Sequence, residues 1–347
     1  MKRATAPVLP PEFNARRLIR RALGITVLAV IVLVAVSTLP GLDEVRDRIA
    51  NGRPAWLLAA LGLKLASVLA FVAAFRGVFC PRMGWRLSAQ IATAEQAANV
   101  LLPTGGAGGL ALGAWALQRG GMDTAHIARR TVAFFLLTSA VNFAAIVVAG
   151  SVLALGIGGS VGRAVALVPV ALAVIVVVGV IVLPRVLPTA TDRPRGRLLR
   201  HLSTGGAALA DGIQIAGALL RARDPMVIAG AIGYMGFDVA ALAAAFAAFG
   251  DVPGPAVIVL AYAVGQLGGL IPIPGGIGGV DGGLIAAFVI YGTPAPVATA
   301  AVLAYRTVQL GLPAVVGTIG FVRLQRTLAH SSDPAALCAP MAAGALR

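Results

Sequence analysis

The chain has 347 residues, of which 59% are hydrophobic and only 12% are charged, and its mean hydropathy is +0.91. Soluble domains are about 45–50% apolar and about 25% charged, so this composition excludes an ordinary soluble protein and indicates a membrane protein. The net charge of +15 comes from Arg and Lys gathered in short segments between apolar runs. That placement is typical of cytoplasmic loops and argues against nucleic-acid binding.

The chain begins with a basic arm at residues 1–21, followed by a long apolar run at residues 22–39. Together they resemble a signal peptide, but the apolar core exceeds the usual length of about 7–15 residues. We therefore predict an uncleaved first span with the arm in the cytoplasm, and cleavage near Ser37 remains the alternative. The next loop, residues 40–53, mixes acidic and basic residues and is expected on the outer side.

Five further apolar runs have the length of membrane-spanning helices. They lie at residues 54–79, 131–150, 164–183, 226–249 and 296–320. Arg and Lys concentrate on one side of these runs, which places both termini in the cytoplasm. The chain is thus predicted to be a multi-pass inner-membrane protein with one transmembrane domain at residues 22–326. Residues 327–347 form a small polar tail that we expect to be disordered.

Between the fourth and fifth spans lies a basic segment, residues 185–223. Within it, residues 198–220 carry Leu and Ile at helical spacing, which predicts an amphipathic helix along the inner membrane surface. A solvated cytoplasmic linker is the alternative.

Two other apolar segments are broken in the middle by proline and glycine. Residues 87–121 contain Pro103 and the motif GGAGG, whereas residues 255–291 contain Pro272, Pro274 and the motif GGIGG. Proline removes an amide donor and glycine loosens a helix interior, so a single spanning helix is disfavoured in each segment. We predict two re-entrant helical hairpins, the first with both ends inside and the second with both ends outside.

The two hairpins belong to a predicted internal repeat. The GGxGG motifs begin at Gly105 and Gly275, and each lies between two spans in the same order. The first copy, residues 54–150, starts outside and the second, residues 226–320, starts inside. Broken segments at matching positions of two inverted halves are typical of transporter sites at the repeat interface. The alternative is that the small residues only permit close helix packing.

The broken helices supply the predicted binding site. Half-helix N-termini present free amides and the positive end of the helix dipole, which favour an anion such as a phosphate. Glycine at the turn lets the backbone approach that group. The candidate substrate-binding glycines are Gly105, Gly106, Gly108, Gly275, Gly276 and Gly278.

Ionisable residues inside the apolar segments are rare and usually face a cavity or a partner. Arg306 is a candidate to clamp a phosphate, and Asp281 to pair with Arg306, carry a proton or cap a half-helix. Glu95 in the first hairpin is a similar candidate. Lys64 and Asp238 are further intramembrane charges, for which a structural ion pair is the alternative.

Enzymatic chemistry has no support in the sequence. The two cysteines are far apart and the three histidines have no metal-ligand spacing, so we expect neither metal nor cofactor. No serine has a plausible histidine partner at membrane depth. We expect a protein that is not an enzyme.

The second block, IPIPGGIGGVDGGL followed by AVLAYRTVQLGLPAVVG, resembles the lysylphosphatidylglycerol synthase transmembrane region family, the flippase-like UPF0104 group. In that family the block carries an acidic residue and then an arginine, positions that Asp281 and Arg306 fill here. The first block, LLPTGGAGGLALGAWALQRGG, is also similar, but it lacks the family's glutamate after Gly109, and Asp281 stands where glutamate is usual. No segment resembles the synthase's aminoacyl-transferase domain, so the resemblance implies only the flippase half.

These observations predict an all-α polytopic membrane protein with six transmembrane helices and two re-entrant hairpins in an inverted repeat. The leading hypothesis is a transporter that moves an anionic phospholipid or lipid-linked envelope precursor between leaflets. One alternative is a non-transporting scaffold subunit for a cell-envelope enzyme, which would then be its partner. Another is a carrier for a small soluble anion.

Overall fold

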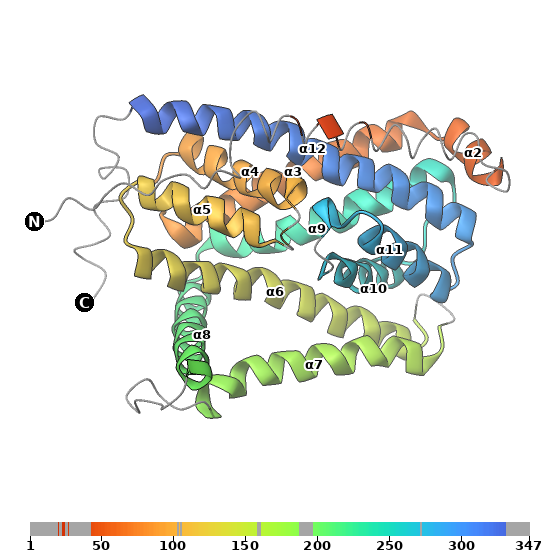
Figure 1. The fold of residues 1–347 in the computed structure, drawn as a ribbon. Helices are drawn as coiled ribbons and strands as arrows, with labels where there is room; N and C mark the ends of the chain where they lie inside the picture. Colours follow the sequence, from red (N-terminus) through yellow and green to blue (C-terminus); the bar gives the residue numbers. More distant parts are fainter. Residues whose placement is uncertain are drawn as a thin grey trace, which may run out of the picture.

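A computed structural model describes residues 43–330, apart from 103, 105, 158–160, 187–196 and 271–272, together with the isolated positions 20, 23, 24 and 27. This described part consists of α-helices and short 3-10 helices and contains no strand (Figure 1). The elements are α2 (Asp43–Ala50), α3 (Pro54–Phe79), α4 (Trp85–Leu101), α5 (Ala107–Arg119), α6 (Thr124–Ala154), α7 (Arg163–Val186), α8 (Arg197–Arg221), α9 (Pro225–Phe249), α10 (Pro255–Gln266), η2 (Leu267–Leu270), η3 (Pro274–Gly276), α11 (Gly279–Ile290) and α12 (Ala295–His330).

Within these described ranges, five helices are long and apolar enough to cross a membrane. They cover Pro54–Phe79, Thr124–Ala154, Arg163–Leu183, Pro225–Phe249 and Ala295–Ala329, and so match the second to sixth predicted spans. The first predicted span, residues 22–39, lies outside the described residues except for three isolated positions. The all-α, multi-pass membrane fold expected from the sequence is confirmed.

Helical structure extends beyond the predicted spans in several places. Helix α6 begins at Thr124 and not near 131, because the Asp123 carboxylate caps it by accepting hydrogen bonds from the amides of Ala125 and His126 at 3.0 and 3.1 Å. Helix α12 extends to His330, so residues 327–330 are helical and do not belong to a disordered tail. The loop expected at residues 40–53 contains the short helix α2.

Helices α3 and α9 run antiparallel along their whole length and form the central pair of the molecule (Figure 1). Arg53 at the start of α3 donates its amide to the Ala248 carbonyl at the end of α9, and Ser67 bonds to the Tyr234 carbonyl halfway along. Gly230 allows this contact, because a Cβ there would lie 2.6 Å from the backbone nitrogen of Ala74. Small residues at such a crossing let two membrane helices approach closely.

The other helices pack around this pair in matching sets. Helix α4 packs on α5 and α12, and correspondingly α10 packs on α11 and α6. Helix α6 contacts both α3 and α9, and so does α12. The α4–α5 and α10–α11 hairpins lie toward opposite ends of the long helices (Figure 1). This arrangement is the one expected of two halves that run in opposite directions.

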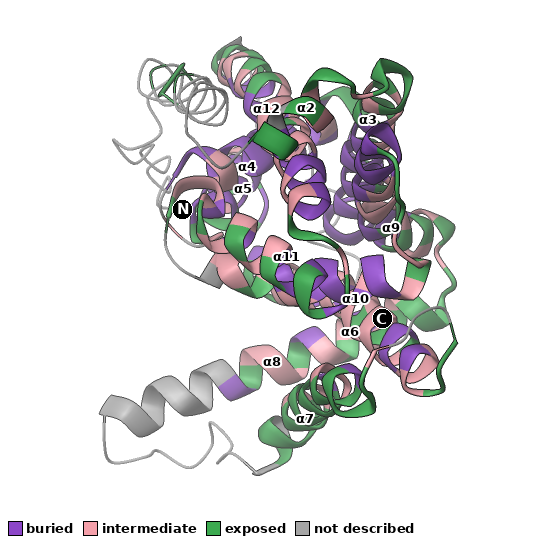
Figure 2. Ribbon diagram, turned by 90° about the vertical axis from the view of Figure 1, so that its right-hand side faces the viewer, coloured by how far each residue is buried: buried purple, intermediate pink, exposed green. Residues whose placement is uncertain are grey.

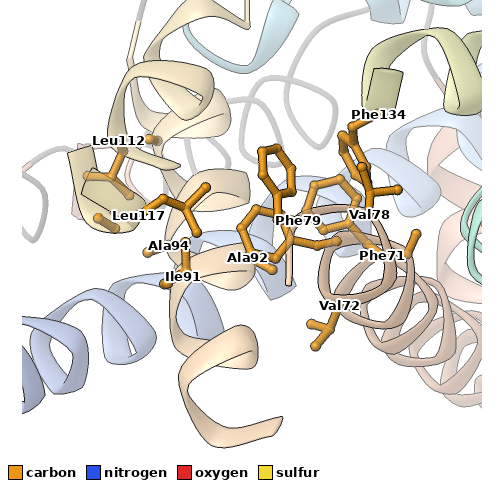
Figure 3. Packing of buried hydrophobic residues seen from close by; sticks show 14 of the residues in the cluster. Phe71, Val72, Val78, Phe79, Ile91, Ala92, Ala94, Leu112, Leu117 and Phe134 are labelled. Atoms are coloured by element: carbon orange, nitrogen blue, oxygen red, sulfur yellow. The ribbon is translucent and has the colours of Figure 1, made fainter. Parts of the chain in front are cut away.

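The core consists of two clusters of buried apolar side chains. The first contains Phe71, Phe79 and Phe134 together with residues of α4 and α5, which interlock in Figure 3. The second contains residues of α9, α10, α11 and the first half of α12. On α12, residues up to Tyr305 belong to the second cluster and those from Ala314 to the first. Each hairpin therefore packs into its own cluster, and the centre of the molecule lies between them.

Helices α7 and α8 lie outside this core. Most of α7 is exposed and apolar, as its colouring in Figure 2 shows, and this is the composition of a helix that faces lipid. Helix α8 crosses the direction of α6 and α7 at a steep angle and packs on both (Figure 1). The helix predicted at residues 198–220 is thus present, and its orientation suits a helix lying along a membrane surface.

Candidate functional site

The turn of the first hairpin is closed by its own side chains. Gly106 precedes α5 with φ +90°, a left-handed conformation that glycine adopts without strain. At the start of α5, Thr104 Oγ1 accepts from the Gly108 amide and Asn99 Oδ1 from the Gly109 amide, each at 2.8 Å. The sequence predicted that these amides are free for an anion. They are not free here, because the turn satisfies them internally.

The turn of the second hairpin contains three left-handed glycines, Gly275, Gly276 and Gly278. The Gly278 amide donates to Asp281 Oδ2 at 2.7 Å, so Asp281 caps the start of α11, one of the roles considered from the sequence. Gly278 itself is exposed and Asp281 is partly exposed. This turn therefore reaches the molecular surface.

The second turn also reaches the first hairpin. The 3-10 helix η3 packs against α4, and a Cβ at Gly275 would lie 3.5 Å from the Val100 carbonyl oxygen and 2.9 Å from Leu310 Cδ2. The second turn thus lies against the C-terminal end of α4, the first helix of the first hairpin. Gly105 in the first turn lies outside the described residues.

Arg306 fastens this second turn to α12. Its Nε donates to Asp281 Oδ1 at 2.7 Å, one terminal nitrogen donates to the Gly275 carbonyl, and the other donates to Gln309 Oε1. The Arg306 residue is only 5% exposed, whereas the Asp281 side chain is 19% exposed. A guanidinium has five N–H donors, so two of them have no partner among the described residues.

A second ion pair lies deeper. Lys64 Nζ on α3 and Asp238 Oδ1 on α9 are 2.6 Å apart, and both side chains are buried. The other carboxylate oxygen, Oδ2, accepts hydrogen bonds from the hydroxyls of Tyr262 at 2.8 Å and Tyr305 at 2.9 Å. A buried charge is tolerated when it is paired and its remaining lone pairs are hydrogen-bonded, which is the case for Asp238.

Gln309 links the two ion pairs. Its Oε1 accepts from Arg306 and its Nε2 lies 3.4 Å from Asp238 Oδ2. A continuous polar path therefore runs from Lys64 through Asp238, Gln309 and Arg306 to Asp281 and the second turn. Two positive and two negative charges compensate each other along this path. We call these groups, with Tyr262 and Tyr305, the central network.

Sequence reasoning missed Tyr262, Tyr305 and Gln309. A signal was present, because each is a polar side chain within an apolar helix, and Gln309 follows Arg306 by one helical turn. Of the candidate site residues, the structure brings together Lys64, Asp238, Asp281, Arg306 and the glycines of the second turn. Glu95 is not part of this network, and Gly106 and Gly108 contribute to the fold of the first turn.

Metal binding finds no candidate in the part of the chain that the structure describes. No group of three or more His, Cys, Asp and Glu side chains in that part is placed to hold a metal ion. The central network contains hydrogen-bond donors and a guanidinium whose charge is balanced by Asp281; guanidinium groups form strong, charge-assisted hydrogen bonds with anions.

The fold and the central network define a polytopic α-helical membrane protein with two broken hairpins that meet at buried charges. The family model described as "Lysylphosphatidylglycerol synthase TM region" matches residues 21–317. The chain belongs to that family, and the resemblance recognised in the two glycine-rich blocks is confirmed. No curated protein matches the chain.

Proposed function

We propose that the protein is a flippase-like transporter that moves an anionic lipid or lipid-linked precursor between the leaflets of the inner membrane. The observation that carries this proposal is the bonding of Arg306, which holds the second hairpin turn through Gly275 and Asp281 and leaves two N–H donors without a partner among the described residues. A substrate phosphate would compete with Asp281 for the guanidinium, since a carboxylate and a phosphate are both anions whose oxygens accept paired N–H donors from arginine. Binding would then release the turn.

The surroundings of the turn favour a lipid over a soluble anion. Leu267 and Ile273, which flank the turn, are 59% and 41% exposed, and η2 packs on both η3 and α11. A polar group that reaches the surface beside exposed apolar side chains suits a molecule with a charged headgroup and acyl chains. The chains would remain in the bilayer while the headgroup enters the protein.

The two hairpins are the moving part in this proposal. They are short helices joined by glycine-rich turns, and they contact each other near Val100 and Gly275. Movement of one hairpin against the other would expose the headgroup site to one side and then to the other, the alternating access that inverted halves allow. We infer transport and not catalysis, because the central network contains no nucleophile activated by a base.

Reconstitution in liposomes tests this proposal. Vesicles with and without the protein receive trace amounts of a fluorescent anionic phospholipid, a zwitterionic phospholipid or a labelled lipid-linked precursor, and a membrane-impermeant quencher reports the outer-leaflet fraction. We expect faster exchange of at least one anionic lipid in protein-containing vesicles. Exchange equal to that of empty vesicles for every lipid would contradict the proposal.

A parallel arm separates the two alternatives. Vesicles loaded with phosphate or a soluble organic phosphate report release of a small anion. Release without lipid exchange would identify a small-anion carrier. Neither lipid exchange nor release, combined with stable copurification of an envelope enzyme, would favour a scaffold subunit.

A further inference from the structure

Glu95 is a buried carboxylate that the proposed transport site does not use. It lies in α4, 5% exposed, and α5 covers it: a Cβ at Gly113 would lie 2.8 Å from Glu95 Oε2. No hydrogen bond or ion pair to the Glu95 carboxylate is found among the described residues. Next to it, the buried Nε2 of Gln96 also lacks a partner in the described part of the chain.

The second hairpin shows that this crossing does not require a carboxylate. The two GGxGG motifs begin 170 positions apart (275 minus 105), so the same offset relates the two hairpins. Glu95 in the first hairpin then corresponds to Gly265 in the second, and Gly113 corresponds to Gly283. In the second hairpin these two glycines meet, and a Cβ at Gly283 would lie 3.1 Å from the Gly265 carbonyl oxygen. The same crossing is thus made by two glycines in one hairpin and by glycine and glutamate in the other. The approach of the two helix backbones at this crossing therefore does not by itself call for a carboxylate.

The charges around Glu95 do not compensate it. Helix α4 packs on α3, α5, α12 and η3. The basic residues of those helices are Lys64, bound to Asp238, and Arg306, bound to Asp281, together with Arg76, Arg119, Arg323 and Arg326 nearer the helix ends, while η3 has no titratable residue. On α9, the Tyr234 phenol lies within electrostatic range of the carboxylate.

An ionised carboxylate in such a site is expensive, because burial removes most of its hydration and no cation among the described residues replaces it. A neutral carboxylic acid is far cheaper to bury. We propose that Glu95 is a proton-binding site inside the first hairpin, protonated while α4 and α5 are packed as observed and ionised when the hairpin separates and admits water. Protonation adds one proton from water to one carboxylate oxygen, and opening returns it.

In this scheme Glu95 is a positioning residue that makes closure of the first hairpin depend on pH. A role of Glu95 in driving transport rests on the proposed function, but the binding of a proton to Glu95 does not. The tests therefore need no lipid substrate, and their failure would leave the transport proposal standing.

Infrared spectroscopy of the full chain in nanodiscs tests proton binding. The difference spectrum between acidic and alkaline buffer should contain the C=O stretch of a buried carboxylic acid that titrates. Glu95→Gln should remove this band, and Glu44→Gln, which removes an exposed carboxylate paired with Arg48, should keep it. The band should be the same in sodium and in choline buffer. A band that survives in Glu95→Gln, or one that sodium abolishes, would overturn the proposal.

Hydrogen exchange tests the link to the hairpin. At alkaline pH, the amides of α4 and α5 should exchange several-fold faster in the wild type than in Glu95→Gln, whereas at acidic pH the two should be equal. Comparison at the same pH cancels the intrinsic effect of pH on exchange. Equal exchange at both pH values would contradict the proposal. If Glu95→Gln does not fold, Glu95→Met, which is similar in size and uncharged, replaces it in both experiments.

Discussion

Four charged side chains in the centre of the protein form two ion pairs that differ in exposure. Lys64 and Asp238 are both buried, whereas Asp281 is partly exposed beside Arg306. In a buried pair the cost of desolvation can exceed the Coulomb attraction, so the additional hydrogen bonds decide the balance. The two tyrosine hydroxyls that reach Asp238 supply them. We therefore regard the buried pair of Lys64 and Asp238, the inner pair, as structural. We regard the pair of Arg306 and Asp281, the outer pair, as the one that a substrate anion can displace.

The inner pair makes a prediction about stability. Lys64→Met should lower the stability of the protein in detergent by about 3–5 kcal/mol, because Asp238 keeps its charge without a cation. Adding Asp238→Asn should recover much of that loss, since asparagine still accepts from the tyrosines without carrying a charge. Thermal unfolding of the two single variants and the double variant measures the coupling. Strictly additive losses would mean that the two groups do not depend on each other.

Several site residues were predictable, and their contacts were not. Asp281 and Arg306 were identified because charges are rare in apolar segments, and their pairing was one of the roles considered. The role of Thr104 and Asn99 was not foreseen, because a polar side chain beside a turn gives no sign in the sequence of which amide it will cap. Two amides of the first turn are therefore already hydrogen-bonded, and an anion site at that turn stays a prediction. The link between the two ion pairs through Gln309 could not be predicted either, because it depends on how the helices pack in three dimensions.

Glycine decides how closely the helices approach, and its position on a helix decides whether it matters. On α12, a Cβ at Gly317 would overlap the Thr93 carbonyl oxygen of α4, whereas one at Gly311 would meet nothing within 4 Å. Gly317 is thus required for close contact between α12 and α4, whereas Gly311 on the same helix makes no such contact. Composition alone does not separate these two cases.

These two glycines form a matched test of the α4–α12 contact. Gly317→Ala should destabilise the protein by about 1–3 kcal/mol, because two backbones must separate to admit the methyl group. Gly311→Ala should be neutral or stabilising by up to about 1 kcal/mol, since alanine favours helix over glycine. Melting temperatures in detergent measure both. Equal shifts for the two variants would mean that α4 and α12 do not pack as described.

For the molecule as a whole, the length of the apolar runs predicted the membrane-spanning helices, and the GGxGG motifs predicted the two hairpins. The ends of the helices were harder to predict from the sequence. They depend on single capping residues such as Asp123, or on packing beyond the apolar run, as in α12. The antiparallel contact of α3 and α9 supports two halves of opposite direction, but the sides of the membrane remain a prediction from charge.

Cysteine labelling tests those sides. In a background without Cys80 and Cys338, Ala128→Cys near the start of α6 and Val252→Cys in the turn between α9 and α10 place thiols at exposed positions. A membrane-impermeant maleimide added to whole cells should label Val252→Cys and spare Ala128→Cys. Lysed cells should show labelling of both. Labelling of both positions in intact cells would contradict the inverted arrangement.

The central claim is that the charge of Arg306 binds a lipid headgroup and does not merely hold the turn. The double variant Arg306→Gln with Asp281→Asn keeps hydrogen-bonding side chains at both positions and removes both charges. The matched control is Arg323→Gln, an exposed residue on the same helix. We predict that the double variant folds and melts within a few degrees of the wild type but exchanges anionic lipid in liposomes at least tenfold more slowly, while the control exchanges at the wild-type rate. Wild-type exchange by the folded double variant would contradict the account.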